Sequence, residues 1–319
     1  MTKLPAVLVL LVAGMPLAEG QPPKTDGVTI ETIKDSDKPV LEYRHGDDLF
    51  KPYVRKFFSP GGVNVLRDEV PDHPHHHGLM FAVAIDGVDF WAETKTSGRQ
   101  VYTAFGREDS PGGLPWAGWL GEWVEWFAPS GGRKLASESR TITVYRSQPL
   151  GASLLTWRTE LRAGGGRPSI KLSGSHYFGL GMRFVQSMDG ADDFFTPAGK
   201  SKTRLGEAAG ETVRGNERLV RGKWCAYAAE ADGKPVTVAM FDHPSNVRPA
   251  WWFIMAKPFA YLSATLNLHR EPLTVEAGKP LALTYGVAVW DGRVKADEIE
   301  KLYARWLELP APTSAANKP

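Results

Sequence analysis

A run of histidines is the feature of the sequence with the clearest chemical potential. Four of the eight histidines fall within five positions, as His73, His75, His76 and His77 around Pro74. Alternate residues of an extended segment face the same side, so His73, His75 and His77 are expected on one face. Neutral imidazole binds transition metals, and its pKa suits acid–base catalysis. Three interpretations stay open: one divalent metal ion held by His73, His75 and His77, a metal-free site with His75 and His77 as catalytic residues, or a structural loop.

A second short motif predicts a partner for this run. The triplet Asp-His-Pro at 72–74 recurs at 242–244, where it continues into Ser245 and Asn246. Each copy adjoins an apolar stretch, which indicates two equivalent loops at the same end of a strand-rich fold. We therefore predict that His243 faces the first run as a third catalytic residue, and that Asn246 contacts the substrate.

Aromatic and cationic residues supply candidate binding groups. Four tryptophans crowd positions 116–126, Trp91 follows the first motif and Trp251 follows the second. Aromatic side chains present a large flat face, so Trp91 and Trp251 are expected to stack on sugar rings. Arg183 and His176 are expected to bind substrate oxygens. The competing interpretation is that most of these tryptophans, and His176, belong to the core.

The remaining sequence predicts the strands that would position these groups. Apolar runs recur at intervals of about 8–12 residues between turn-forming segments, a spacing typical of sandwiches and barrels. Asp86-Gly87 between two such runs is a strong hairpin signal, because both residues tolerate positive φ. Only residues 295–308 repeat apolar positions at spacings of three and four. We predict an all-β fold: a large two-sheet antiparallel sandwich over residues 21–309 as a single domain, with one C-terminal helix and a disordered tail at 310–319.

The first 20 residues have the pattern of an export signal. Lys3 precedes an apolar run at 6–13, and Ala18 and Gly20 place small residues before a cut ahead of Gln21. No later stretch has the length and apolar character of a membrane span. We predict a signal peptide at 1–20, a periplasmic or secreted protein, and no span in the mature chain.

Composition excludes several classes of protein. The 38 Lys and Arg residues nearly balance the 36 Asp and Glu residues, and no long block of one charge occurs, so no nucleic-acid partner is expected. The single cysteine, Cys225, excludes an internal disulfide and any cysteine-based metal centre. Its alternating surroundings predict a buried, unreactive thiol.

Four segments together resemble a known family. The run DHPHHHGL at 72–79, the hairpin through 88–91, DHPSN at 242–246 and the closing strand at 281–292 are similar to the PmoA-like family of exported bacterial proteins, a domain of unknown function labelled as a methane oxygenase. The resemblance implies a β-rich fold similar to the galactose-mutarotase-like supersandwich and a setting among sugar-degrading proteins. It assigns no catalytic residues. Methane oxygenation is not expected, because such a subunit would need several membrane spans.

Two functional hypotheses result. The first is an exported enzyme that acts on a saccharide or keto-sugar glycoside by hydrolysis, elimination or epimerisation at the histidine site. The second is a non-catalytic sugar-binding or extracellular scaffold protein, whose histidines only shape loops. Hydrolysis by paired carboxylates fits less well, because no Asp/Glu pair stands beside the run. An oxygenase with an N-terminal histidine is a distant third, because the predicted mature terminus is Gln21.

Overall fold

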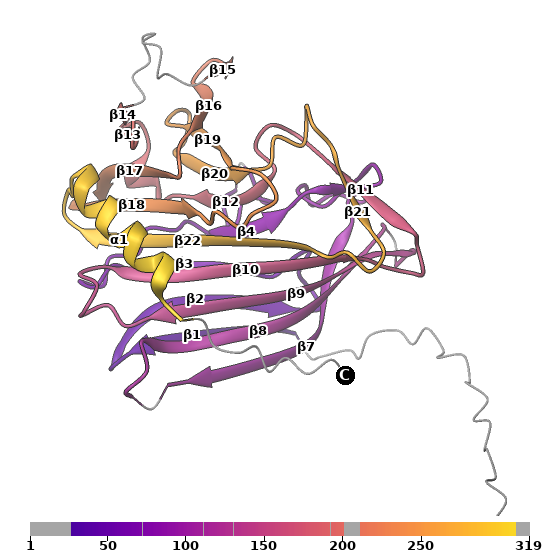
Figure 1. The fold of residues 1–319 in the computed structure, drawn as a ribbon, viewed down its shortest axis with the longest axis horizontal. Coiled ribbons are helices and arrows are strands. Elements are labelled where there is room, and N and C mark those ends of the chain that lie inside the picture. Colours follow the sequence, from indigo (N-terminus) through magenta and orange to yellow (C-terminus); the bar gives the residue numbers. More distant parts are fainter. Residues whose placement is uncertain are drawn as a thin grey trace, which may run out of the picture.

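Two antiparallel sheets form a sandwich (Figure 1). The computed structural model describes residues 27–310, except 72, 111, 130, 192 and 201–210. The predicted leader at 1–20 and residues 311–319 of the predicted tail lie outside the described residues. Every strand pairing among the described residues is antiparallel, so the predicted all-β sandwich is confirmed.

The first sheet carries the histidine run at the entrance to one of its inner strands. Its described strands are, in spatial order, β1 (Val28–Asp35), β2 (Lys38–Gly46), β3 (Tyr53–Phe57), β4 (Leu79–Ala82), β12 (Gly179–Arg183), β20 (Tyr261–Thr265), β19 (Trp251–Met255), β16 (Glu217–Arg221) and β15 (Glu211–Arg214). Because β4 is buried along its whole length, the residues just before it are held against the core.

The second sheet is built from the longer strands. Its described strands are, in spatial order, β14 (Gly199–Lys200), β13 (Phe194–Thr196), β17 (Trp224–Ala231), β18 (Lys234–Asp242), β22 (Leu281–Asp291), β10 (Ser153–Ala163), β9 (Lys134–Tyr145), β8 (Trp116–Phe127) and β7 (Arg99–Asp109). Side chains alternate between its two faces. Cys225 on β17 points inward and is fully buried, which confirms the predicted buried thiol.

A third, four-stranded sheet lies beside the sandwich. Its strands are, in order, β21 (Leu273–Glu276), β11 (Ser169–Ser173), β5 (Ala84–Ile85) and β6 (Val88–Asp89). The predicted hairpin joins β5 to β6, with φ of 50° at Asp86 and 83° at Gly87. This sheet was not predicted, because β5 and β4 form one uninterrupted apolar run in the sequence, and only residue 83 separates them.

A buried polar network joins the two large sheets. Arg140 of β9 donates hydrogen bonds to the hydroxyl of Tyr43 on β2 (3.1 Å) and to Glu138 (2.9 Å). Tyr43 in turn donates to Glu122 at 2.6 Å. Arg140 also donates to the carbonyl oxygen of Pro52 at 3.1 Å. The network therefore fixes the backbone immediately before β3, which carries part of the candidate site.

One α-helix, α1 (Ala296–Glu308), packs on the outer face of the second sheet (Figure 1). Its buried residues recur at the predicted spacings of three and four: Ile299, Leu302, Tyr303 and Trp306. Asp297 and Glu298 stand in the first turn, where negative charge is favoured by the helix dipole. The helix predicted at 295–308 is confirmed, and a single 3₁₀ turn, η1 (Gln186–Met188), is the other described helical element.

Candidate functional site

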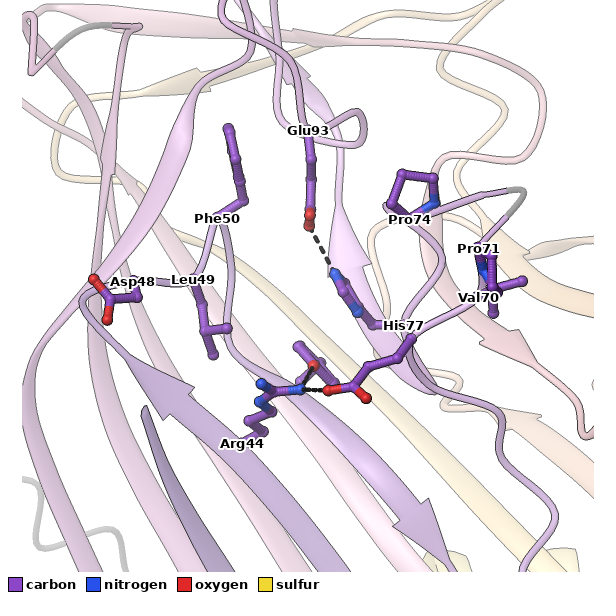
Figure 2. Close-up of a pocket in the computed structure, with 11 residues that line it drawn as sticks. Arg44, Asp48, Leu49, Phe50, Val70, Pro71, Pro74, His77 and Glu93 are labelled. Carbon is purple, nitrogen blue, oxygen red and sulfur yellow. Dashed lines mark hydrogen bonds and ion pairs between the residues drawn. The ribbon is translucent and has the colours of Figure 1, made fainter. Parts of the chain in front are cut away.

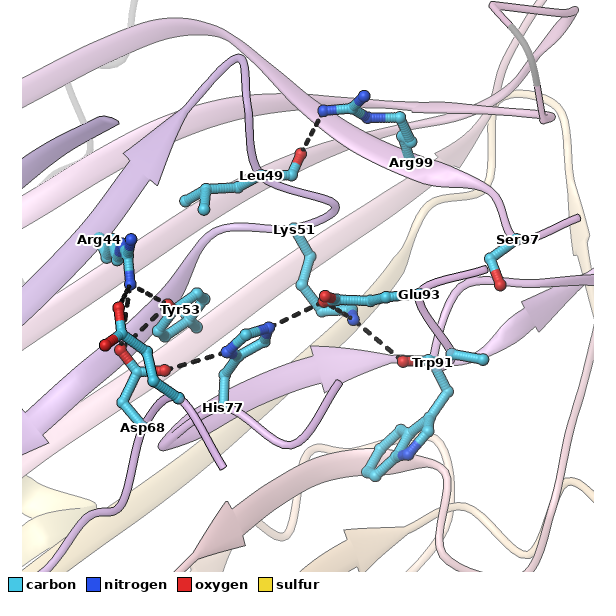
Figure 3. Close-up of polar contacts among 12 residues, drawn as sticks. Arg44, Leu49, Lys51, Tyr53, Asp68, His77, Trp91, Glu93, Ser97 and Arg99 are labelled. Carbon is cyan, nitrogen blue, oxygen red and sulfur yellow. Dashed lines mark hydrogen bonds and ion pairs between the residues drawn. The ribbon is translucent and has the colours of Figure 1, made fainter. Parts of the chain in front are cut away.

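His77 lies between two carboxylates (Figure 3). Its Nδ1 is 3.0 Å from Oδ1 of Asp68, and its Nε2 is 2.8 Å from Oε1 of Glu93. Ionised carboxylates only accept hydrogen bonds, so a protonated imidazole donates to both. The prediction that His77 belongs to a polar site is consistent with this geometry. The expectation that no Asp/Glu pair stands beside the run was wrong, because Asp68 and Glu93, which are distant in sequence, meet at His77.

On one side, Glu93 is held by a buried lysine. Lys51 donates from Nζ to Oε1 of Glu93 at 2.6 Å and to the carbonyl oxygen of Trp91 at 2.9 Å. The side chain of Lys51 is 0% exposed, whereas that of Glu93 is 15% exposed. Glu93 is therefore the member of this pair that solvent or a ligand can reach.

On the other side, Asp68 is held by Tyr53 and Arg44. The Tyr53 hydroxyl donates to Oδ2 of Asp68 at 3.1 Å and accepts a hydrogen bond from Nη1 of Arg44 at 3.0 Å. The ring of Tyr53 also stacks on His77, with centroids 4.1 Å apart and an interplanar angle of 12°. Tyr53 thus fixes both the orientation of the imidazole and the carboxylate behind it.

This arrangement fixes the charges of the site. Burial acts to lower the pKa of His77, but the hydrogen bonds to Asp68 and Glu93 outweigh it, so the pKa is raised. Burial acts to raise the pKa of Glu93, but His77 and Lys51 lower it to about 2. Burial lowers the pKa of Lys51, which its pairing with Glu93 partly offsets. The site therefore favours a protonated imidazole beside an ionised carboxylate.

His77 and Glu93 face a cavity of about 380 Å³ (Figure 2). Its wall combines charged, aromatic and apolar side chains: Arg44, Asp48, Leu49, Phe50, Tyr53, Glu69, Val70, Pro71, Pro74, His77 and Glu93. Figure 2 shows the His77–Glu93 pair between the 48–50 segment on one side and the two prolines on the other. A volume in this range fits a small organic ligand.

The other three histidines of the run pack against each other and an aromatic residue. The rings of His73 and His76 are stacked with centroids 4.8 Å apart, and His75 meets His76 edge-on at 4.6 Å. His73 and His76 both contact Phe259, whose ring centroid also lies 3.6 Å from the guanidinium carbon of Arg183. The structure therefore brings Arg183 near the histidine run, but Arg183 is 1% exposed and does not line a cavity with His77, so its role in substrate binding stays a prediction.

The predicted metal ligands do not form a coordination set. Both ring nitrogens of His77 are bonded to carboxylates, so His77 offers no free lone pair beside His73 and His75. No group of three or more His, Cys, Asp or Glu side chains within the described part of the chain is arranged to hold a metal ion. We expected His73, His75 and His77 on one face of an extended segment. The segment is not extended, because His73 and His76 lie in successive turns.

His243 lies elsewhere, which corrects the prediction that the two Asp-His-Pro loops converge. Its Nδ1 is 2.6 Å from the hydroxyl of Ser245, and its ring meets Trp306 of α1 edge-on at 5.5 Å. It follows β18 on the outer face of the second sheet, whereas His77 enters β4 of the first sheet. A three-residue match fixes local turn chemistry but not which sheet a loop leaves.

A family match covers most of the chain. Residues 32–304 match the model of a protein family described as a family of unknown function, DUF6807. The chain belongs to this family. The match names no activity, and the resemblance to the PmoA-like family stays a prediction. No curated protein matches the chain in sequence.

Several solved structures of carbohydrate-active proteins are similar to the chain at low identity. A GH36 α-galactosidase from Geobacillus stearothermophilus is 10% identical over 84% of this chain and 41% of its own, with a TM-score of 0.46. The α-galactosidase from Lactobacillus brevis is 7% identical over 88% and 42%, with a TM-score of 0.46. A putative aldose 1-epimerase from Klebsiella pneumoniae is 9% identical over 91% and 83%, with a TM-score of 0.44. The chain spans less than half the length of the galactosidases.

Among the described residues of this DUF6807 member, no helix has the length and apolar character needed to cross a membrane.

Trp91 and Asn246, two of the predicted substrate contacts, have structural roles. Trp91 is 2% exposed and stacked on Phe178 with centroids 5.1 Å apart, so its face is covered. The Asn246 amide bonds to Asp242 (2.7 Å) and to both backbone groups of Thr284 (2.7 and 2.9 Å), which locks the loop after β18.

The remaining predicted contacts are dispersed. Trp251 on β19 is half-buried beneath the guanidinium of Arg221, 3.7 Å from the ring. His176 bonds through Nε2 to Glu217 at 3.0 Å and is packed against Tyr177. Neither residue lines the His77 cavity.

Sequence reasoning missed four residues that hold His77: Asp68, Glu93, Lys51 and Tyr53. A weak signal existed for two of them, because Asp68 and Glu93 bracket the run at nine and sixteen positions from His77. Lys51 and Tyr53 carried none, because a lysine and a tyrosine before a strand are ordinary in any sequence. Only the packing of β3 against β4 brings them to the site.

Proposed function

We propose that the His77 cavity binds a saccharide and transfers protons to and from its oxygen atoms. We further propose, from the leader predicted at residues 1–20, that the protein acts in the periplasm or outside the cell. The observation that carries the catalytic proposal is the 2.8 Å contact between the raised-pKa imidazole of His77 and the ionised carboxylate of Glu93 at the cavity wall.

His77 and Glu93 form an acid and a base side by side. Oε1 of Glu93 accepts hydrogen bonds from both His77 and Lys51, while no described residue bonds to Oε2, which is left for a substrate. The raised pKa of His77 favours the protonated imidazole, which can act as a proton donor. The donor and the acceptor are therefore separated by a single hydrogen-bond length.

This spacing suits two oxygens bonded to one carbon, as at the reducing end of a sugar. Glu93 takes the proton of the anomeric hydroxyl, and Nε2 of His77 turns its N–H from Glu93 to the ring oxygen and gives that oxygen the proton. The bond between the anomeric carbon and the ring oxygen then breaks and leaves a carbonyl. Reclosure on the other face of that carbonyl returns both protons and yields the other anomer. Epimerisation at this carbon is therefore the favoured reaction.

Glycoside hydrolysis by the two carboxylates is less consistent with the geometry. Retaining and inverting glycosidases place a sugar between two carboxyl groups about 5–5.5 or 6.5–9.5 Å apart. Here the imidazole of His77 fills the space between Asp68 and Glu93. Asp68 is behind His77, where it supports the imidazolium and cannot flank a glycosidic bond.

The cavity wall supports a saccharide as the ligand. Arg44, Asp48 and Glu69 offer charged groups that make strong hydrogen bonds to hydroxyls. Phe50 adds a half-buried aromatic ring on the same wall. A wall of this kind combines directional polar contacts with a flat apolar surface, as a pyranose ring requires.

A non-catalytic sugar-binding protein is the second candidate. It is favoured by the observation that both ring nitrogens of His77 are engaged and that Tyr53 stacks on its ring. A purely structural histidine would need the same contacts. The two candidates differ in whether replacing His77 changes turnover or only stability.

The test measures anomer interconversion of aldoses by NMR, together with product analysis on disaccharides and 3-keto-glycosides. Wild-type protein is compared with His77→Gln, Glu93→Gln and the matched histidine control His243→Gln, each checked for folding by circular dichroism. We expect wild-type protein and His243→Gln to accelerate interconversion, with a rate that falls as pH rises past the His77 pKa. His77→Gln and Glu93→Gln should lose it. Sugar binding without turnover would favour the second candidate, and neither binding nor turnover would refute both.

A further inference from the structure

The outer face of the second sheet is covered unevenly. α1 packs over the part formed by β17, β18 and β22, where the outward residues include Ala226, Ala239, Phe241 and Ala288. Figure 1 shows β7 to β10 beside this covered part. There the outward residues change from apolar to polar, and Arg158 on β10 is exposed. We call the outward side of β7 to β10 the open face.

A row of paired residues crosses the open face. Gly106 of β7 pairs with Gly121 of β8, and Gly121 pairs with Thr141 of β9. Thr141 pairs with Arg158 of β10, and Arg158 pairs with Thr284 of β22. Its last three residues, Thr141, Arg158 and Thr284, line a cavity, and we call the row together with this cavity the trough. Neighbouring strands lie about 4.8 Å apart, so the trough from β7 to β22 is about 19 Å long.

Two tryptophans stand on either side of the glycine end. Trp119 and Trp123 lie two positions before and after Gly121 on β8, so all three face outward. Nε1 of Trp119 donates to Glu108 at 3.2 Å, which fixes that ring. Trp123 is half-buried and lines a cavity of about 560 Å³. These are two of the four crowded tryptophans whose role the His77 site does not explain.

The other end of the trough is rich in hydroxyl groups. A cavity of about 420 Å³ is lined there by Thr141, Thr143, Thr156 and Thr284, and by His243. The hydroxyl of Thr156 bonds to Tyr145 (3.4 Å) and to Trp306 (2.7 Å), whereas those of Thr141, Thr143 and Thr284 can donate and accept hydrogen bonds to the hydroxyls of a sugar. Protein-binding surfaces have an apolar, aromatic core instead. The lining therefore favours a polyhydroxylated ligand over a protein partner.

Several charged side chains of the open face form ion pairs with opposite charges on the same face. Glu160 pairs with Arg162, and Glu125 pairs with Lys134 at 3.3 Å. Arg158 makes no ion pair or hydrogen bond with any described residue, so its guanidinium is available in the middle of the trough. A single free cation does not make the extended positive surface that a polyanion needs.

We propose that this trough binds an extended neutral polysaccharide, at a site separate from the His77 cavity. The chain would cross β8 to β22, with one sugar ring against Trp123. Arg158 and the threonine hydroxyls would hold the following rings. The inference goes beyond the proposed function, because it involves none of the residues around His77.

The test is affinity electrophoresis of the full chain through gels that contain soluble β-glucan, xyloglucan or galactomannan, with polygalacturonate as the acidic polymer. We expect at least one neutral polymer to retard the wild-type protein. Trp123→Ala and Arg158→Ala should each weaken retardation about tenfold, which corresponds to about 1.4 kcal/mol. Thr141→Val, which keeps the shape and removes one hydroxyl, should weaken it less.

Two controls separate this site from its surroundings. Arg293→Ala removes an exposed arginine that pairs with Asp193 away from the trough, and it should bind as the wild type does. His77→Gln should also keep polymer binding, so failure of the His77 proposal leaves this one intact. The proposal is overturned if no neutral polymer is bound, if only polygalacturonate is bound, or if folded Arg158→Ala and Trp123→Ala bind as tightly as the wild type.

Discussion

Nε2 of His77 lies 2.8 Å from the Glu93 oxygen that also accepts the 2.6 Å hydrogen bond of Lys51. One carboxylate oxygen thus receives two cationic donors in a largely buried setting. This relationship ties the loop before β4 to the segments that precede β3 and follow β6. It also makes the three side chains energetically interdependent.

Breaking the Lys51–Glu93 pair should be costly. Lys51→Met removes one member of a buried ion pair, so we expect the free energy of unfolding to fall by about 3 kcal/mol. Glu93→Gln should also destabilise, because it leaves the buried ammonium without its counter-charge. Chemical denaturation of the two single variants and the double variant should give a coupling of about 1–3 kcal/mol. Additive losses of unfolding free energy would show that Lys51 and Glu93 stabilise the fold independently.

The contribution of His77 to stability should decline at high pH. Its folded-state pKa is raised above the ordinary value of 6.5, so its contribution is complete below that value and is lost as pH rises through the folded-state pKa. His77→Gln should therefore destabilise the protein more at pH 6 than at pH 9, measured by urea denaturation. Burial lowers the pKa of His243, so the contribution of that residue runs in the opposite direction and is lost at low pH. Equal pH trends for the two variants would contradict this assignment.

His76 should make the protein sensitive to acid. Burial first, and then the charges of neighbouring His75 and His73, lower the pKa of His76 to about 2. The unfolded chain binds a proton below pH 6.5 and the folded chain does not, so stability falls as pH drops below 6.5, by up to about 1.4 kcal/mol per pH unit. We expect His76→Gln to lose less stability than the wild type between pH 7 and pH 5. A parallel loss would mean that other groups carry the acid response.

Gly181 on β12 should tolerate no side chain. A Cβ there would overlap the Tyr261 hydroxyl and lie 2.9 Å from the ring of Trp91. Gly181→Ala is therefore expected to destabilise by about 1–3 kcal/mol in a thermal melt. The Tyr261 hydroxyl is buried and finds no hydrogen-bond partner among the described residues, so Tyr261→Phe should be neutral or stabilising. It should also partly rescue Gly181→Ala, and an unrescued double variant would place the strain elsewhere.

Local patterns in the sequence determined the elements of this protein. The recurring apolar runs, the Asp86-Gly87 turn and the three-and-four spacing in α1 each depend on neighbours a few residues apart. Burial of one face is enough to select a strand or a helix from such patterns. For the same reason the sequence identified the histidine run as polar and unusual.

Tertiary structure alone decided which groups meet. His77 finds Asp68, Glu93, Lys51 and Tyr53 because β3 pairs with β4 and because the loop after β6 returns across them. His243, despite its matching triplet, follows a strand of the second sheet and packs against Trp306 of α1. Side-chain periodicity fixes the face that a residue occupies, but strand order fixes its partners. Strand order depends on contacts between residues far apart in the chain, which no short motif encodes.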